Sequence, residues 1–211
     1  MTLPPPDPAP RRLLRDVAYE ALLSSIVSGE YAPGAKLSDG ELAARLGLSR
    51  APVRDALARL TAERLVVSKP QSYTRVAPLV AEEIRGALAV VRAMHTLAVR
   101  EALPRLRENR LHDMRAANAA FVRAVEAGDI ASAISADDAF HAVPVSASGN
   151  RPLSDTIARY TPLLRRLEHQ RFSSEAARAS AARHEELITA CEARDAERAA
   201  KIAYEIWAEL E

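Results

Sequence analysis

Apolar side chains recur at helical spacing along most of this chain, and short turns and β-type runs interrupt the pattern in its first third. That third contains three short amphipathic stretches: one helix is predicted at 13–28, and two more within 37–65, joined by a tight turn at Gly47. Two β-type runs follow, at 66–67 and 74–76. The pattern therefore predicts a helix-turn-helix followed by a two-stranded wing.

After Pro78 the chain is rich in Ala, Leu and Arg at helical spacing and has few β-branched runs. This pattern predicts six helices, at 82–103, 108–127, 129–143, 150–172, 174–193 and 195–210. Short connections place consecutive helices antiparallel, which is typical of a bundle. Pro144 lacks a backbone N–H and is expected to end or kink the third of these helices.

The resulting fold class is mainly α, with an N-terminal winged helix-turn-helix and a C-terminal antiparallel all-α bundle. The proline-rich segment 1–10 has too few apolar side chains to dock and is predicted to be a disordered arm. Residues 11–78 are predicted to bind DNA, and residues 79–211 to form the helical domain. A chain of 211 residues is long enough to give each domain its own core.

The formal net charge of +1 is unevenly distributed. Residues 1–78 carry 11 Lys/Arg against 8 Asp/Glu, a surplus of +3, whereas residues 79–211 carry 18 against 20, or −2. The positive surplus thus coincides with the predicted helix-turn-helix, as a nucleic-acid-binding domain requires.

Cysteine content and hydropathy indicate the compartment. Cys191 is the only cysteine, so no intramolecular disulfide forms, and a small buried apolar role is expected. No apolar run reaches the roughly 18 residues of a membrane helix, and the first residues lack a signal-peptide core. We therefore expect a cytoplasmic protein without a membrane partner.

The second helix of the predicted helix-turn-helix has an apolar face and a basic face. Val53, Leu57 and Leu60 form its apolar stripe. If that stripe is buried, Arg50 and Arg54 point outward, where the major groove of DNA accepts such side chains. Single-sequence patterns of this kind also describe ordinary solvated helix faces, but the turn and the spacing together favour DNA binding.

One helix of the predicted bundle carries candidate metal ligands. Asp137 and His141 are four residues apart and share a face with Phe140, which we expect to be buried. A divalent cation is one partner that satisfies both groups, and His184 could join them from another helix. On the residues alone, a hydrogen-bonded Asp–His pair remains an alternative.

The first domain resembles the winged-helix head of GntR transcription regulators, through the phrase SR-x-PVR-x-AL at 49–57. The resemblance implies that arginines of this phrase contact operator DNA, with wing residues near phosphates. The candidate DNA-contacting residues are Ser49, Arg50, Ala51, Arg54, Lys69 and Arg75. Two positions depart from the family pattern: Gly40 replaces another DNA-contacting arginine, and Tyr73 replaces a wing glycine.

The second domain resembles the FCD effector domain of FadR-type GntR regulators, through D-x-x-F-H at 137–141, GN-x-x-L at 149–153, His184 and Asp195. In that family an Asp and three His hold Zn, Ni or Mn, which meets a small carboxylate effector. The resemblance assigns Asp137, His141 and His184 as ligands. The remaining histidine position falls near Ile206, which cannot ligate a metal, and His169 or Glu205 could substitute only from a suitable orientation.

Three more positions follow from this resemblance. Arg92 falls on a motif position and could donate to an anionic effector, or else neutralise an acid such as Asp137. Ile206 and Trp207 are candidate effector-lining residues. His95 stands where relatives commonly carry Glu.

The leading hypothesis is a homodimeric transcription regulator, typically a repressor in this family, that binds a two-fold operator and responds to a small metabolite. One alternative is a metal-free regulator whose pocket, made apolar by Ile206 and Trp207, binds an apolar ligand. Another is a metal-dependent hydrolase with a DNA-binding head. We do not expect an enzyme, because no positioned general base accompanies the candidate ligands.

Overall fold

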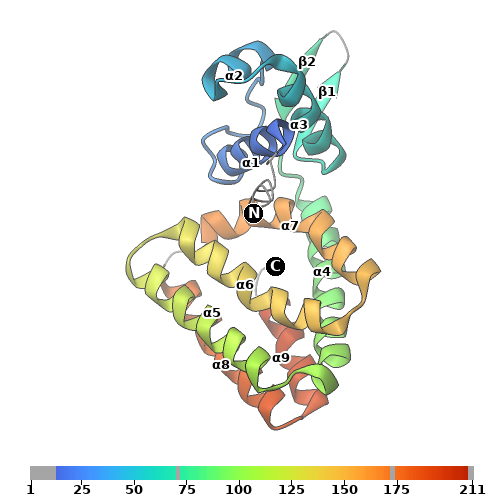
Figure 1. Ribbon diagram of the computed structural model, residues 1–211, viewed down its shortest axis with the longest axis vertical. Coiled ribbons are helices and arrows are strands. Elements are labelled where there is room, and N and C mark those ends of the chain that lie inside the picture. The colour runs from blue at the N-terminus through green and yellow to red at the C-terminus, as the bar shows by residue number, and fades with distance from the viewer. Residues whose placement is uncertain (1–12, 70–71, 172–173, 209–211) are drawn as a thin grey trace, which may run out of the picture. The chain divides into compact units, whose positions relative to one another are not determined.

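The computed structural model describes residues 13–69, 72–171 and 174–208 (Figure 1). The chain divides into two compact units, Met1–Pro78 and Leu79–Glu211. The predicted arm at 1–10 lies outside the described residues. Within the described ranges, no helix combines the length and the apolar character needed to cross a membrane.

The first unit is a winged helix-turn-helix, as predicted. Its elements are α1 (Leu14–Val27), α2 (Asp39–Leu46), α3 (Arg50–Ala62), β1 (Val66–Lys69) and β2 (Tyr73–Val76). The two strands are antiparallel, with Val66 opposite Val76. One core joins them to the helices, because the buried face of each helix packs into it together with the first residue of β1 and the last of β2.

Local chemistry fixes the turn between α2 and α3. Ser38 caps α2 by accepting a hydrogen bond of 3.4 Å from the Glu41 N–H. Gly47 ends that helix at φ 66°, a left-handed conformation that glycine adopts without steric cost. Ser49 stands at the N-cap position of α3, but its side chain makes no capping hydrogen bond there.

The second unit is an all-α bundle. Its elements are α4 (Ala81–Ala102), a 3₁₀ turn η1 (Leu103–Arg105), α5 (Glu108–Glu126), α6 (Ile130–Ser148), α7 (Arg151–Arg171), α8 (Ser174–Glu192) and α9 (Ala196–Ala208). Helix α4 packs against α6, α7 and α9, and α5 packs against α6 and α8 (Figure 1). Helix α6 therefore lies between α4 and α5, where side chains from several helices can meet.

Helix α6 is longer than the sequence pattern predicts. The sequence pattern predicts an end at Val143, but the helix continues through Pro144 to Ser148. Pro144 removes only one helical N–H and is buried, so packing holds the helix together beyond it. Gly149, at φ 66°, provides the actual end. Asn150 then accepts from the Leu153 N–H at 3.2 Å at the start of α7.

Candidate functional site

Two arginines, Arg50 and Arg54, lie on the solvent-exposed face of α3. Val53 and Leu60 are fully buried and Leu57 nearly so, which turns Arg50 and Arg54 to the exposed face. Neither guanidinium forms an ion pair or hydrogen bond with any residue that the structure describes. Ser49 and Ala51 are exposed beside them. The packing beneath α3 thus produces the orientation that base contact requires.

Gly40 affects where Arg50 can lie. A Cβ built at Gly40 would stand 3.1 Å from Nη2 of Arg50, so the Arg50 side chain lies against the start of α2. The resemblance to the GntR family implies only that a DNA-contacting arginine is absent at position 40. The structure adds that the Arg50 side chain occupies the space beside Gly40.

A groove of about 720 Å³ lies between α2, α3 and the wing. Lys36, Arg54 and Lys69 contribute positive charge to its lining, which suits a phosphate backbone. The other wing arginine, Arg75, donates to the Gly34 carbonyl at 3.3 Å, and its guanidinium lies 5.5 Å from the Tyr73 ring. Of the two wing cations singled out from sequence, Lys69 therefore lines this groove, whereas Arg75 contacts the Gly34 carbonyl and the Tyr73 ring.

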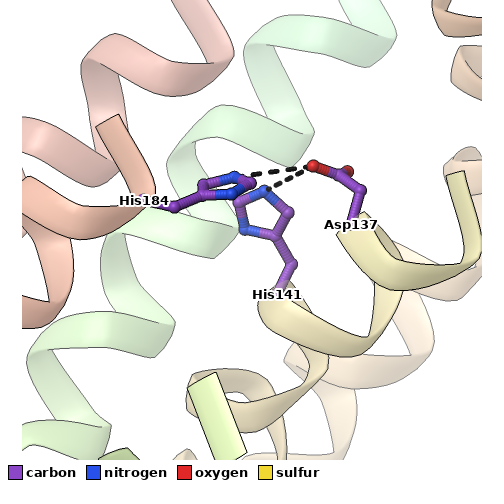
Figure 2. A group of neighbouring side chains, drawn as sticks. All are labelled: Asp137, His141 and His184. Atoms are coloured by element: carbon purple, nitrogen blue, oxygen red, sulfur yellow. Dashed lines mark ion pairs between the residues drawn. The ribbon is translucent and has the colours of Figure 1, made fainter. Parts of the chain in front are cut away.

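The three candidate metal ligands meet inside the bundle. Asp137 and His141 project from α6 and His184 from α8 (Figure 2). Oδ1 of Asp137 lies 3.8 Å from Nε2 of His141 and 3.5 Å from Nε2 of His184. One donor atom from each residue falls within 4.8 Å of the others, and all three residues are buried. Helical spacing within α6 and the packing of α8 together bring them to one point.

His184 has two differently satisfied ring nitrogens. Its Nδ1 lies 3.0 Å from Oδ1 of Asn118 on α5. Its Nε2 is buried and forms no hydrogen bond with the described part of the chain. The sequence reasoning missed Asn118, although a signal existed: it is a polar residue on the stripe of Leu111, Met114 and Phe121 that α5 buries.

Arg165 on α7 is the cation that faces Asp137. Its Nη1 lies 3.4 Å from Oδ2 of Asp137, and its Nη2 contacts Oδ1 of Asp138. The two oxygens of the Asp137 carboxylate therefore have different partners: Oδ1 faces the two histidines and Oδ2 faces Arg165. The sequence offers Arg92 as an alternative partner for Asp137, but the Arg92 guanidinium lies 4.6 Å from the centre of the Tyr204 ring.

A small cavity of about 150 Å³ adjoins His141. Trp207 lines it and stacks on His95, with ring centres 4.4 Å apart. Arg165 also lines the cavity, whereas Ile206 and Arg92 are not among its lining residues. Of the three effector-lining candidates, the structure thus brings Trp207 to the cavity and places Ile206 in the hydrophobic core.

Of the two substitute ligands considered from sequence, the structure tests only Glu205, which is not part of this cluster. Glu205 lies 3.6 Å from Arg183 and 3.9 Å from Lys201, which gives its carboxylate other partners. The side chain of His169 lies outside the described residues.

Burial dominates the protonation of the cluster. Desolvation lowers the pKa of His184 to about 3 and also lowers the pKa values of His95 and His141. Desolvation raises the pKa of Asp137, but His141, His184 and Arg165 outweigh it and hold that pKa below the usual value. At neutral pH the cluster therefore combines a carboxylate with neutral imidazoles, which is the state that binds metal cations.

These pKa shifts predict that the metal-free protein loses stability on acidification. Below pH 6.5, His184 in the unfolded chain binds more protons than His184 in the folded chain. Its contribution to the free energy of unfolding is therefore complete above pH 6.5 and declines as the pH falls toward 3. For His184 alone the expected loss at about pH 5 is roughly 2 kcal/mol. Denaturant unfolding at several pH values measures it. His184→Gln should flatten the dependence, and an unchanged pH profile in that variant would contradict the assignment.

Comparison with known proteins agrees with both halves of this description. Residues 14–76 match the family described as bacterial regulatory proteins, gntR family, and residues 87–209 match the FCD domain. The regulator YieP of Escherichia coli K12, named as an HTH-type transcriptional regulator, is 41% identical over 71 residues, which are 33% of this chain and 31% of YieP. A Streptomyces ambofaciens regulator of the same type is 47% identical over 57 residues, 27% of this chain and 24% of that protein. The matched region thus spans about a third or less of these relatives.

Solved structures share the whole fold. McbR/YncC of E. coli has a TM-score of 0.83 at 22% identity, covering 94% of this chain and 95% of that one. A GntR transcriptional regulator from Rhodococcus sp. RHA1 has a TM-score of 0.75 at 22% identity, covering 93% and 96%. These likenesses concern the fold, and the family matches concern the sequence. The chain belongs to the gntR family of bacterial regulatory proteins and carries an FCD domain.

Proposed function

We propose that the chain acts as a homodimer that binds a two-fold operator in the cytoplasm and represses transcription until a small carboxylate effector reaches its FCD domain. The observation that carries the proposal is the pair of exposed arginines, Arg50 and Arg54, on a helix whose opposite face is fixed in the core. Lys69, which lines the groove beside them, supports the proposal because it supplies positive charge for the phosphate backbone.

A divalent metal in the FCD domain is the second part of the proposal. The support is the buried Nε2 of His184, which faces a carboxylate oxygen and forms no hydrogen bond within the described residues. With its lone pair on Nε2, His184 faces Oδ1 of Asp137 as a second acceptor, and a cation between the two atoms would satisfy both. Asp137, His141 and His184 would hold Zn, Ni or Mn, and three protein ligands leave room for water or effector.

The cavity beside His141 is the proposed effector site. A metal held by His141 would polarise a carboxylate bound there, and Trp207 and His95 would form an aromatic wall. Arg165 and Asp138, which contact each other, line the same cavity, so the positive charge that would attract an anion there comes from the metal. These features favour a small anionic ligand.

A metal-free regulator is the second candidate. It is favoured by Ile206, which stands where relatives carry a further histidine, and by the apolar part of the cavity wall formed by Val145 and Ile157. Metal content of the purified protein, measured by mass spectrometry, separates the two candidates.

The exposed face of α4 supports the homodimer. Gly86, Ala89, Val90, Ala93 and Leu97 are all exposed and recur at helical spacing along it. Small and apolar residues on one solvent-facing stripe are typical of a helix that packs against another copy.

Selection of bound duplexes from a random DNA pool should therefore yield an inverted repeat. Two heads related by a two-fold axis require two half-sites, about one helical turn or a multiple of it apart. Sequencing of the enriched duplexes measures the repeat. Enrichment of single half-sites, or no enrichment, would contradict the proposal.

A matched pair of variants tests the dimer. Val90→Glu with Leu97→Glu places charge on the exposed α4 stripe and should give a monomer by light scattering that has lost affinity for the full repeat. Tyr204→Glu changes a somewhat more exposed residue on α9 and should remain dimeric. A dimeric double variant would remove α4 as the interface.

A further inference from the structure

Asn118 connects α5 to two groups on α8. Its side chain is buried, at 7% exposure. Its Nδ2 donates to the Ala181 carbonyl at 3.2 Å, and its Oδ1 lies 3.0 Å from Nδ1 of His184. One amide therefore contacts both the backbone of α8 and the imidazole next to Asp137.

These two contacts determine where the proton of His184 lies. A backbone carbonyl only accepts hydrogen bonds, so the amide nitrogen of Asn118 has to face Ala181. The amide oxygen then faces His184 and also only accepts, so Nδ1 carries the hydrogen. In the neutral imidazole this leaves the lone pair on Nε2, the atom 3.5 Å from Oδ1 of Asp137.

The aromatic neighbours of His184 do not make this choice. Phe140 stacks on the imidazole with ring centres 3.9 Å apart, and Phe121 lies tilted at 5.6 Å. Such contacts hold the plane of the ring but act in the same way on either tautomer. Two polar groups face the two nitrogens: Asn118 is within hydrogen-bond distance of Nδ1, whereas Asp137, 3.5 Å from Nε2, forms no hydrogen bond with it.

We propose that Asn118 is the positioning residue of the metal site: it holds His184 in the Nδ1–H tautomer and so directs the Nε2 lone pair at the cation. The inference rests on the proposed function, because it assumes that Asp137, His141 and His184 bind metal. Asn118 acts through His184 and is not itself a ligand. Outer-shell partners of this kind typically change metal affinity by about 10- to 100-fold when they are removed.

The tautomer is tested in the metal-free full chain. Long-range ¹H–¹⁵N NMR spectra of the histidine rings distinguish Nδ1–H from Nε2–H, and His184→Gln identifies the signals of His184. The wild type should show the Nδ1–H pattern, which Asn118→Leu should lose. An Nε2–H pattern in the wild type would overturn the inference.

The effect on binding is tested with Zn²⁺ alone, in competition with a coloured chelator. Asn118→Leu should bind Zn²⁺ about 10- to 100-fold more weakly. Asn118→Asp keeps an acceptor for Nδ1–H and should bind more tightly than the Leu variant. Met114→Ala removes a buried side chain one turn away on the same helix and should lower the melting temperature without weakening Zn²⁺ binding.

The outcomes separate this inference from the proposed function. Wild-type affinity in Asn118→Leu, or an equal loss in Met114→Ala, overturns the positioning role while leaving the metal site in place. A wild-type chain that binds no Zn²⁺ overturns the metal site and the positioning role together. In that case the NMR spectra still decide the tautomer separately.

Discussion

Replacing both Arg50 and Arg54 with alanine should abolish specific operator binding and leave the fold intact. Each well-placed arginine contact to a base contributes about 1–3 kcal/mol of discrimination, so two correspond to a loss of roughly 30-fold to 10⁴-fold. Stability should hardly change, because both side chains are exposed and neither pairs with a described residue. Fluorescence anisotropy on the selected inverted repeat, with thermal unfolding alongside, measures both effects.

The matched control for this experiment is Arg15→Ala. Arg15 is an exposed arginine of the same unit, on α1 rather than α3. This variant removes one positive charge, half of what the double replacement removes, from a different face, and it should leave specific affinity nearly unchanged. Operator affinity that survives the Arg50 and Arg54 replacements would show that α3 does not read the DNA.

Removing Asp137 should abolish stabilisation by metal. A ligand at about 100 times its Kd stabilises a protein by about 2.7 kcal/mol, which in a chain of this size raises the melting temperature by roughly 5–10 °C. We expect that shift in the wild type with added Zn, Ni or Mn, and none in Asp137→Ala. The reason is that Asp137 supplies the only carboxylate oxygen of the described Asp/His/His group.

Asp155→Ala is the control for non-specific metal binding. Asp155 lies exposed on α7, with a side chain 72% accessible, and its replacement should preserve the metal-induced shift. If the wild-type chain contains negligible metal and its melting temperature does not move, the metal site is wrong and the metal-free regulator becomes the better account.

Local patterns were sufficient to predict the head. The periodicity of Val53, Leu57 and Leu60 identifies the buried face of α3, and the opposite face follows from helix geometry alone. The Asp137–His141 pair follows in the same way, because residues four apart share a helix face. These predictions depend on one element at a time.

The rest of the candidate site depends on which helices meet, and periodicity does not contain that information. Arg165 reaches Asp137 from α7, and Asn118 reaches His184 from α5. Periodicity showed that both belong to helices but not which acid or imidazole each would face. The predicted end of α6 at Val143 was wrong for a related reason. Burial of Pro144 among other helices outweighed the tendency of proline to end a helix.

The sharing of the Asp137 carboxylate between the histidines and Arg165 has an electrostatic consequence for ligand selection. With neutral imidazoles, Asp137, Asp138 and Arg165 sum to a formal charge of −1. A divalent ion held there would change that sum to +1, so the polarity of the site would reverse on loading. An anion that the empty site repels would then be attracted, and metal supply and metabolite supply would have to coincide before the protein could respond.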